Sequence, residues 1–150
     1  MRKVLPLFLI CILLLAGCKS VSIGKDFDFS PGKEISKAQR IVVADAAGTE
    51  MGVLETEEEI DAFVEAVNVE GWGLAELPEG LTRAGSFTLW QEETVTALFG
   101  QKEAEAKAIC TFLIYQGGDY LTIETGFASI SITFSIPGDA AGYLRSLVQE

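Results

Sequence analysis

Three kinds of hydrophobic pattern follow one another along the chain. An uncharged apolar run from Val4 to Leu15 comes first. Apolar residues later recur at helical spacing in two segments, and several short segments between them have strand character, the most regular being the alternation of apolar and polar residues from Ile130 to Ile136. Helical spacing predicts amphipathic helices, and a period of two predicts strands with one buried face.

The clearer of the two helices is expected from Thr56 to Val67. Thr56 and Glu59 have the spacing of a capping box, and Ile60, Phe63 and Val67 fall on one face. The acidic residues of the opposite face are interpreted as a solvated surface. A second helix is expected after Pro137, because proline favours the first turn of a helix. Its apolar stripe consists of Tyr143, Leu144, Leu147 and Val148.

Strands are expected in the segments between and before these helices. A hairpin is predicted at 41–54, with its turn at 45–48, and residues 68–83 read as a long loop. Glu92-Glu93 is interpreted as a short turn between two strands, and 100–107 as a polar connection. The remaining predicted strands cover 86–91, 94–99, 109–115, 120–125 and 130–136.

These elements predict an α+β fold with two layers. About six or seven antiparallel strands form the sheet, and the two helices pack on one of its faces. The order of hairpin, helix, strand meander and closing helix resembles TATA-binding-protein-like arrangements. That resemblance concerns the fold alone and implies no function.

The N-terminal apolar run has the features of an export signal. Arg2 and Lys3 precede it, it is shorter than a membrane-spanning helix, and it ends in Leu15-Ala16-Gly17-Cys18. This ending resembles the lipobox of bacterial lipoproteins. The resemblance implies cleavage between Gly17 and Cys18, a diacylglycerol on the Cys18 sulfur and a location on the extracytoplasmic face of the cell membrane. The alternative is an ordinary signal peptide with Cys18 near the cut.

Several short motifs across the rest of the chain are similar to those of an uncharacterised family of small lipoproteins from Firmicutes. That family has no assigned activity, so the resemblance implies no catalytic residue. The expected organisation is a signal peptide at 1–17, a lipidated cysteine and linker at 18–40, and a single domain at 41–150. The matching motifs are Ile41-Val42-Val43, the acidic helix Glu57 to Val67, Gly118-Asp119-Tyr120, Ile136-Pro137 and Tyr143-Leu144.

Charge is distributed unevenly. Residues 19–40 hold five basic and three acidic side chains, whereas residues 41–150 hold four basic and nineteen acidic ones, a net charge of −15. Binding to nucleic acid or to anionic lipid requires a basic surface. We therefore expect no nucleic-acid partner, and we expect the membrane to be contacted only through the lipid anchor.

Most catalytic and metal-binding chemistry has few candidate residues here. The chain has no histidine, which excludes Ser-His-Asp and Cys-His nucleophile systems, and Cys110 lies in an apolar strand where burial is expected. No metal or cofactor is expected. A carboxylate pair remains an alternative, with candidates at strand ends and turns: Glu92, Glu93, Asp119 and Glu124.

Aromatic residues give the better functional hypothesis. Trp90 is out of phase with Phe87 and Leu89, which predicts an indole on the sheet face away from the helices. Trp72 and Tyr120 are the other candidate binding residues, with a core position as the alternative for Trp72. The leading hypothesis is a non-enzymatic module that binds an extracytoplasmic protein or peptide through the open sheet face and the 68–83 loop. The alternatives are a module for sensing or presenting a small molecule or glycan, and a carboxylate-dependent hydrolase.

Overall fold

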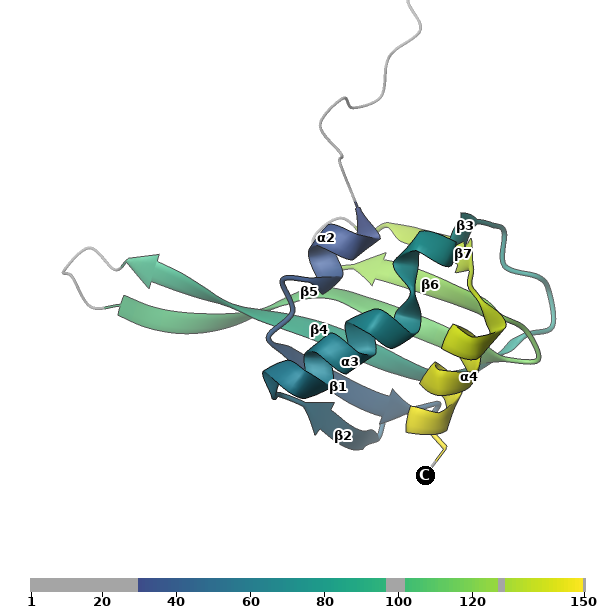
Figure 1. Cartoon of the computed structure of the whole chain (residues 1–150), viewed down its shortest axis with the longest axis horizontal. Coiled ribbons are helices and arrows are strands. Elements are labelled where there is room, and N and C mark those ends of the chain that lie inside the picture. The colour runs from purple at the N-terminus through teal and green to yellow at the C-terminus, as the bar shows by residue number, and fades with distance from the viewer. Residues whose placement is uncertain (1–29, 97–101, 127–128, 150) are drawn as a thin grey trace, which may run out of the picture.

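The computed structural model describes residues 30–96, 102–126 and 129–149. This part of the chain forms one antiparallel sheet in the strand order β2-β1-β4-β5-β6-β7-β3, with helices α3 and α4 on one face (Figure 1). The expected α+β class is confirmed. The strands are β1 (Arg40–Asp45), β2 (Glu50–Leu54), β3 (Gly73–Leu74), β4 (Thr82–Thr96), β5 (Lys102–Gln116), β6 (Tyr120–Thr125) and β7 (Ser131–Ser135), and the helices are α2 (Pro31–Ile35), α3 (Glu57–Val67) and α4 (Gly138–Leu147).

Helix α3 begins at the capping box that the sequence predicts. The backbone N–H of Glu59 donates to Thr56 Oγ1 over 3.2 Å, and the backbone N–H of Thr56 donates to Glu59 Oε2 over 3.1 Å. Asn68 ends the helix in the left-handed conformation, with φ 44°. The two capping-box bonds at the start of α3 satisfy backbone N–H groups that have no partner within the helix.

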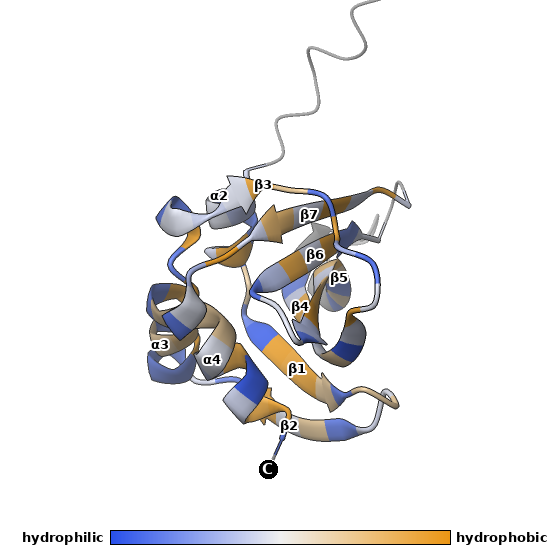
Figure 2. Ribbon diagram, turned by 90° about the vertical axis from the view of Figure 1, so that its right-hand side faces the viewer, coloured by the Kyte–Doolittle hydropathy of each residue, from blue (hydrophilic) through white to orange (hydrophobic). Residues whose placement is uncertain are grey.

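The core lies between the two long helices and the sheet. Phe63 of α3 is fully buried, and its ring centroid lies 5.5 Å from that of Phe87 on β4 and 6.3 Å from that of Tyr143 on α4. Figure 2 shows both helices on one side of the sheet, while the connection between β3 and β4 runs on the other side. The strands contribute these fully buried side chains to the core: Ile41, Phe87, Leu89, Phe112, Leu121 and Ile123.

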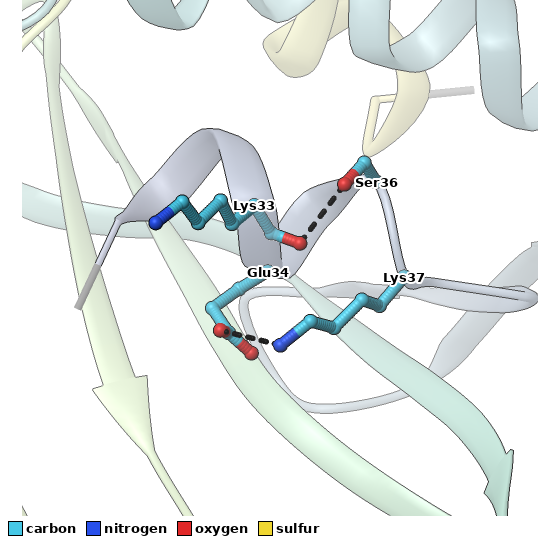
Figure 3. Close-up of polar contacts among 4 residues, drawn as sticks. All are labelled: Lys33, Glu34, Ser36 and Lys37. Atoms are coloured by element: carbon cyan, nitrogen blue, oxygen red, sulfur yellow. Dashed lines mark hydrogen bonds and ion pairs between the residues drawn. The ribbon is translucent and has the colours of Figure 1, made fainter. Parts of the chain in front are cut away.

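The folded domain starts before the expected boundary at residue 41. Residues 31–35 form the short helix α2, and Ile35 and Ala38 are buried in the core. Polar contacts hold this segment locally: Lys37 Nζ lies 2.9 Å from Glu34 Oε1, and the hydroxyl of Ser36 donates to the carbonyl oxygen of Lys33 (Figure 3). The linker expected at 18–40 therefore cannot extend to residue 40. Cys18 and the signal segment lie outside the described residues.

Strands β4 and β5 are longer than predicted. They pair continuously from Thr82 opposite Gln116 to Thr96 opposite Lys102, so the turn expected at Glu92-Glu93 and the polar connection expected at 100–107 are wrong. β1 pairs with β4 only as far as Trp90. Beyond that point the two strands leave the sheet as a two-stranded ribbon, which we define as residues 91–96 and 102–107 (Figure 1).

The loop expected at 68–83 contains a short edge strand. β3 pairs with β7, Gly73 opposite Ser135 and Leu74 opposite Phe134. Because β3 lies at the sheet edge and β4 near the middle, the connection between them runs past the ends of the intervening strands (Figures 1 and 2). Within the described residues, no helix has the length and apolar character needed to cross a membrane.

Candidate functional site

The sheet face away from the helices carries hydroxyl groups on its central strands. Thr88, Thr111, Glu124 and Ser131 lie in register across β4, β5, β6 and β7. The Oγ1 atoms of Thr88 and Thr111 lie 3.3 Å apart. Their neighbours on the helix side are the apolar core residues, so the alternation of the strands produces one apolar and one polar face.

A second group of hydroxyls bonds within the same face. The Tyr115 hydroxyl donates to Thr122 Oγ1 over 2.9 Å, and Thr122 Oγ1 lies 2.8 Å from Thr133 Oγ1. Tyr115 and Thr122 are buried. These bonds satisfy the hydroxyls internally, which makes the centre of the face a structural network rather than a set of free donors.

Trp90 lies at the end of this face where the ribbon begins. Its phase along β4 places it with Thr88, on the opposite side from Phe87 and Leu89, and it is opposite Arg40 of β1. The indole is partly buried, and its Nε1 atom is buried without a hydrogen-bond partner among the described residues. A buried donor left unpaired costs about 1–3 kcal/mol, so a rearrangement on binding that gives the indole N–H an acceptor would be stabilising.

A cavity of about 330 Å³ lies beside Trp90, in the notch where β1 ends and the ribbon continues. Arg40 Nε lies 3.2 Å from Glu55 Oε1 across this notch. The amide of Gln39 closes the end of β1, because its Oε1 accepts the backbone N–H of Glu92 over 2.7 Å. The cavity is lined by Gln39, Arg40, Glu55, Trp90, Gln91, Glu92 and Ala106, and we call it the Trp90 cavity.

A second cavity, of about 450 Å³, shares Gln39 and Glu55 with the first as a common wall. It reaches the first two turns of α3, where Glu57 and Asp61 line it. Four carboxylates and one guanidinium therefore surround the two cavities, and the guanidinium of Arg40 is already paired. Because Arg40 is paired with Glu55, the excess of negative charge around the two cavities comes from Glu92 of the first and from Glu57 and Asp61 of the second, and it favours cationic groups.

Trp72 occupies a different environment. Its Nε1 donates to the carbonyl oxygen of Val67 over 2.7 Å, and its ring centroid lies 5.8 Å from that of Phe112 and 5.5 Å from that of Phe134. The indole packs against the core beneath the end of α3. Trp72 therefore occupies the core-edge position that the sequence analysis gave as its alternative.

Tyr120 lies at the opposite end of the sheet from Trp90. It is partly buried at the start of β6, opposite Ser135. The preceding Asp119 pairs with Arg145 of α4 at 3.0 Å, and Arg145 also donates to the carbonyl oxygen of Gly118. The structure therefore does not bring the three candidate aromatic residues together in one site.

The candidate carboxylates are also separate. Asp119 directly precedes β6, and Glu124 lies within this strand. Their Cα atoms are five residues apart, which is roughly 17 Å along an extended chain. Thr88 of β4 lies two strands away from Glu124 in the same register, and Glu92 lies four residues further along β4. The Cα atoms of Glu92 and Glu124 are therefore roughly 16 Å apart. Paired glycosidase carboxyls are about 5–9.5 Å apart. The backbone positions of Glu92, Asp119 and Glu124 are thus more widely spaced than such a pair, and the side chain of Glu93 lies outside the described part of the structure.

Cys110 is buried as expected, with 1% of its surface exposed. Burial, with a smaller contribution from the negative charge of Glu34, raises the pKa of its thiol to about 12. The thiol therefore stays protonated at neutral pH. No group of three potential metal ligands occurs among the residues that the structure describes.

Sequence reasoning identified Trp90 and Glu92 but missed the other polar walls of the cavity. Gln39 and Arg40 belong to the segment interpreted as a linker, and Glu55 lies between the hairpin and α3. Comparisons of the chain with family models, with curated proteins and with solved structures give no match. The geometry of the notch is therefore the basis for a functional assignment.

Proposed function

We propose that this protein is a lipid-anchored, non-enzymatic module of the cell envelope that binds another extracytoplasmic protein or peptide. The Trp90 cavity is the contact site. The observation that carries the proposal is the position of Trp90, which lines a cavity while its buried indole N–H has no acceptor within the described chain.

The surroundings of Trp90 support binding rather than catalysis. The cavity is lined by planar polar side chains and one aromatic ring, an arrangement that offers hydrogen bonds and a stacking surface. The acids nearest to it either form an ion pair, as Glu55 does with Arg40, or lie at the ribbon base, as Glu92 does. The proposal assigns them to recognition.

Membrane attachment through Cys18 completes the proposal. Two acyl chains on one cysteine hold a protein firmly at a membrane, because each buried CH₂ contributes about 0.8 kcal/mol. At most eleven residues separate Cys18 from Ser30, where the described chain begins. Fully extended, that segment spans roughly 40 Å. The folded domain would thus work close to the membrane surface.

The experiment is capture of partners from detergent-solubilised envelopes with the full-length, lipidated chain as bait. The wild type is compared with Trp90→Ala and with a matched variant, Tyr120→Ala, which removes an aromatic ring at the far end of the sheet. We expect a discrete partner to be lost with Trp90→Ala and retained with Tyr120→Ala. Loss with Tyr120→Ala alone, or capture that neither variant changes, would overturn the proposal.

A further inference from the structure

The ribbon has an open edge that starts at the Trp90 cavity. The pairing of β1 with β4 starts at Arg40, which lies opposite Trp90, and continues toward Asp45. Among the described residues, no strand pairs with β4 beyond Trp90 on the side of β1. Gln39 substitutes for one further residue of β1. Its backbone N–H donates to the carbonyl oxygen of Trp90, and its side chain accepts the N–H of Glu92.

These two bonds fix the direction of the main-chain groups along β4. The carbonyl of Trp90 and the N–H of Glu92 both point toward the side of β1. Because main-chain groups repeat every second residue in a strand, those of Thr94 and Thr96 point to the same side. The Glu92 N–H is already bonded to Gln39, so the β4 edge from the carbonyl of Glu92 to Thr96 presents a row of groups suited to pairing with another strand, over roughly 14 Å.

The geometry points to strand addition by a partner. We propose that the β4 edge of the ribbon, together with the Trp90 cavity, binds an extended, positively charged peptide segment of another extracytoplasmic protein. This inference rests on the proposed function and names the class of partner. A third strand also stabilises a two-stranded ribbon, which is only marginally stable alone in water.

Charge selects this occupant over the alternatives. Glu55, Glu57, Asp61 and Glu92 line the two cavities, and Arg40 is their one basic residue. A second copy of the chain, with a net charge of −11, would be repelled, as would an anionic lipid surface. Lysine or arginine side chains of a bound segment would meet the carboxylates, and the ring of Trp90 offers them a cation–π contact.

The probes for this inference are short, fluorescein-labelled peptides in which Lys alternates with Val. One control has Glu in place of every Lys. Two further controls carry N-methyl groups on alternate residues, in one phase or in the other. Fluorescence anisotropy with the full-length lipidated protein in detergent measures the affinity of each peptide.

We expect the Lys peptide to bind with an affinity that falls as salt rises, and the Glu peptide to bind at least roughly tenfold more weakly. Methylation in one phase should abolish binding, because that phase removes the N–H groups facing β4, and methylation in the other phase should be tolerated. Equal binding of Lys and Glu peptides, or tolerance of both methylation phases, would overturn strand addition.

Protein variants test the same edge from the other side. Thr94→Pro removes a main-chain N–H that points outward, at an edge position where proline is tolerated. It should weaken the Lys peptide roughly tenfold or more, whereas Glu124→Gln, on the open face away from the ribbon, should leave it unchanged. Circular dichroism and the unfolding midpoint identify a Thr94→Pro protein that has lost its fold, in which case the methylated peptides decide.

The two proposals can fail separately. In one outcome, the Lys peptide binds no more tightly than the Glu peptide, but capture of a partner still depends on Trp90. The inferred partner chemistry is then wrong and the proposed function stands. If the Lys peptide binds in the expected phase-dependent way, the strand edge is supported. That result holds even where capture from envelopes does not depend on Trp90.

Discussion

The backbone N–H of Gln39 donates to the carbonyl oxygen of Trp90 over 2.9 Å, at the point where β1 stops and the ribbon continues alone. Among the described residues, this bond is the last main-chain hydrogen bond on the β1 side of β4 before the ribbon. Two residues further along β4, the side-chain oxygen of Gln39 accepts the backbone N–H of Glu92. The same two residues line the Trp90 cavity. The cavity is therefore a consequence of one strand ending beside another that continues.

The two tryptophans should respond differently to truncation. Trp72→Ala removes ring contacts with Phe112 and Phe134, so it should reduce the free energy of unfolding by about 3–5 kcal/mol. Trp90→Ala should reduce it by only about 1 kcal/mol, because Trp90 is partly exposed and its N–H is unpaired. Urea unfolding of both variants measures the difference. Equal losses would mean that Trp90 is a core residue.

The capping box of α3 should make stability depend on pH. Backbone hydrogen bonds from Thr56 and Glu55 lower the pKa of Glu59 from its ordinary value of 4.5. A lowered pKa stabilises the fold above pH 4.5, and this stabilisation is lost as the pH falls through the folded-state pKa. The wild type should unfold at higher urea than Glu59→Gln at neutral pH, and the gap should be narrower at a pH well below 4.5. A gap that is the same at both pH values would contradict this reading.

Cys110 should be inert in the folded protein. Its thiol is buried and its pKa is raised to about 12, so little thiolate forms at neutral pH. An alkylating reagent should label the peptide that contains Cys110 only after denaturation, as mass spectrometry of a digest would show. Labelling at the same rate with and without denaturant would show that the strand opens in the native state.

Cys18 should carry the lipid. Cells grown with a labelled fatty acid should incorporate label into the wild-type protein, whereas Cys18→Ser should remain unprocessed or leave the membrane. Cys110→Ser is the matched control, because it also removes a thiol but should keep the label. Normal incorporation into Cys18→Ser would refute the lipobox interpretation.

Local patterns explain why much of the fold followed from the sequence. The capping box, the helical spacing of the α3 residues and the alternation in β7 are local signals, and tertiary structure did not override them. The sequence pattern did not predict the ribbon, because a strand outside a sheet does not need an apolar face. Glu92-Glu93 was therefore interpreted as a turn. A signal was present: charged residues alternate with alanine from Glu103 to Ala108, a period of two.

The site was only partly predictable for a related reason. The phase of Trp90 against Leu89 indicated its face, but the cavity beside it is also lined by Gln39 and Glu55, which lie in connections distant from β4 along the chain. For Trp72, which stands between two glycines, the sequence left a binding role and a core position open, and it did not indicate Phe112 as the packing partner. Which residues surround each tryptophan depends on contacts between segments that are distant in the sequence, and the pattern of residue types along the chain does not reveal these contacts.

Photo-crosslinking in intact cells tests most directly whether the Trp90 cavity is the contact site. A photoreactive benzoylphenylalanine is incorporated at Gln91, which lines the cavity, or at Tyr120, at the opposite end of the sheet. We expect a discrete crosslinked species from position 91 that disappears when Trp90→Ala is added, and none from position 120. No crosslink from position 91, or the same species from both positions, would contradict this expectation.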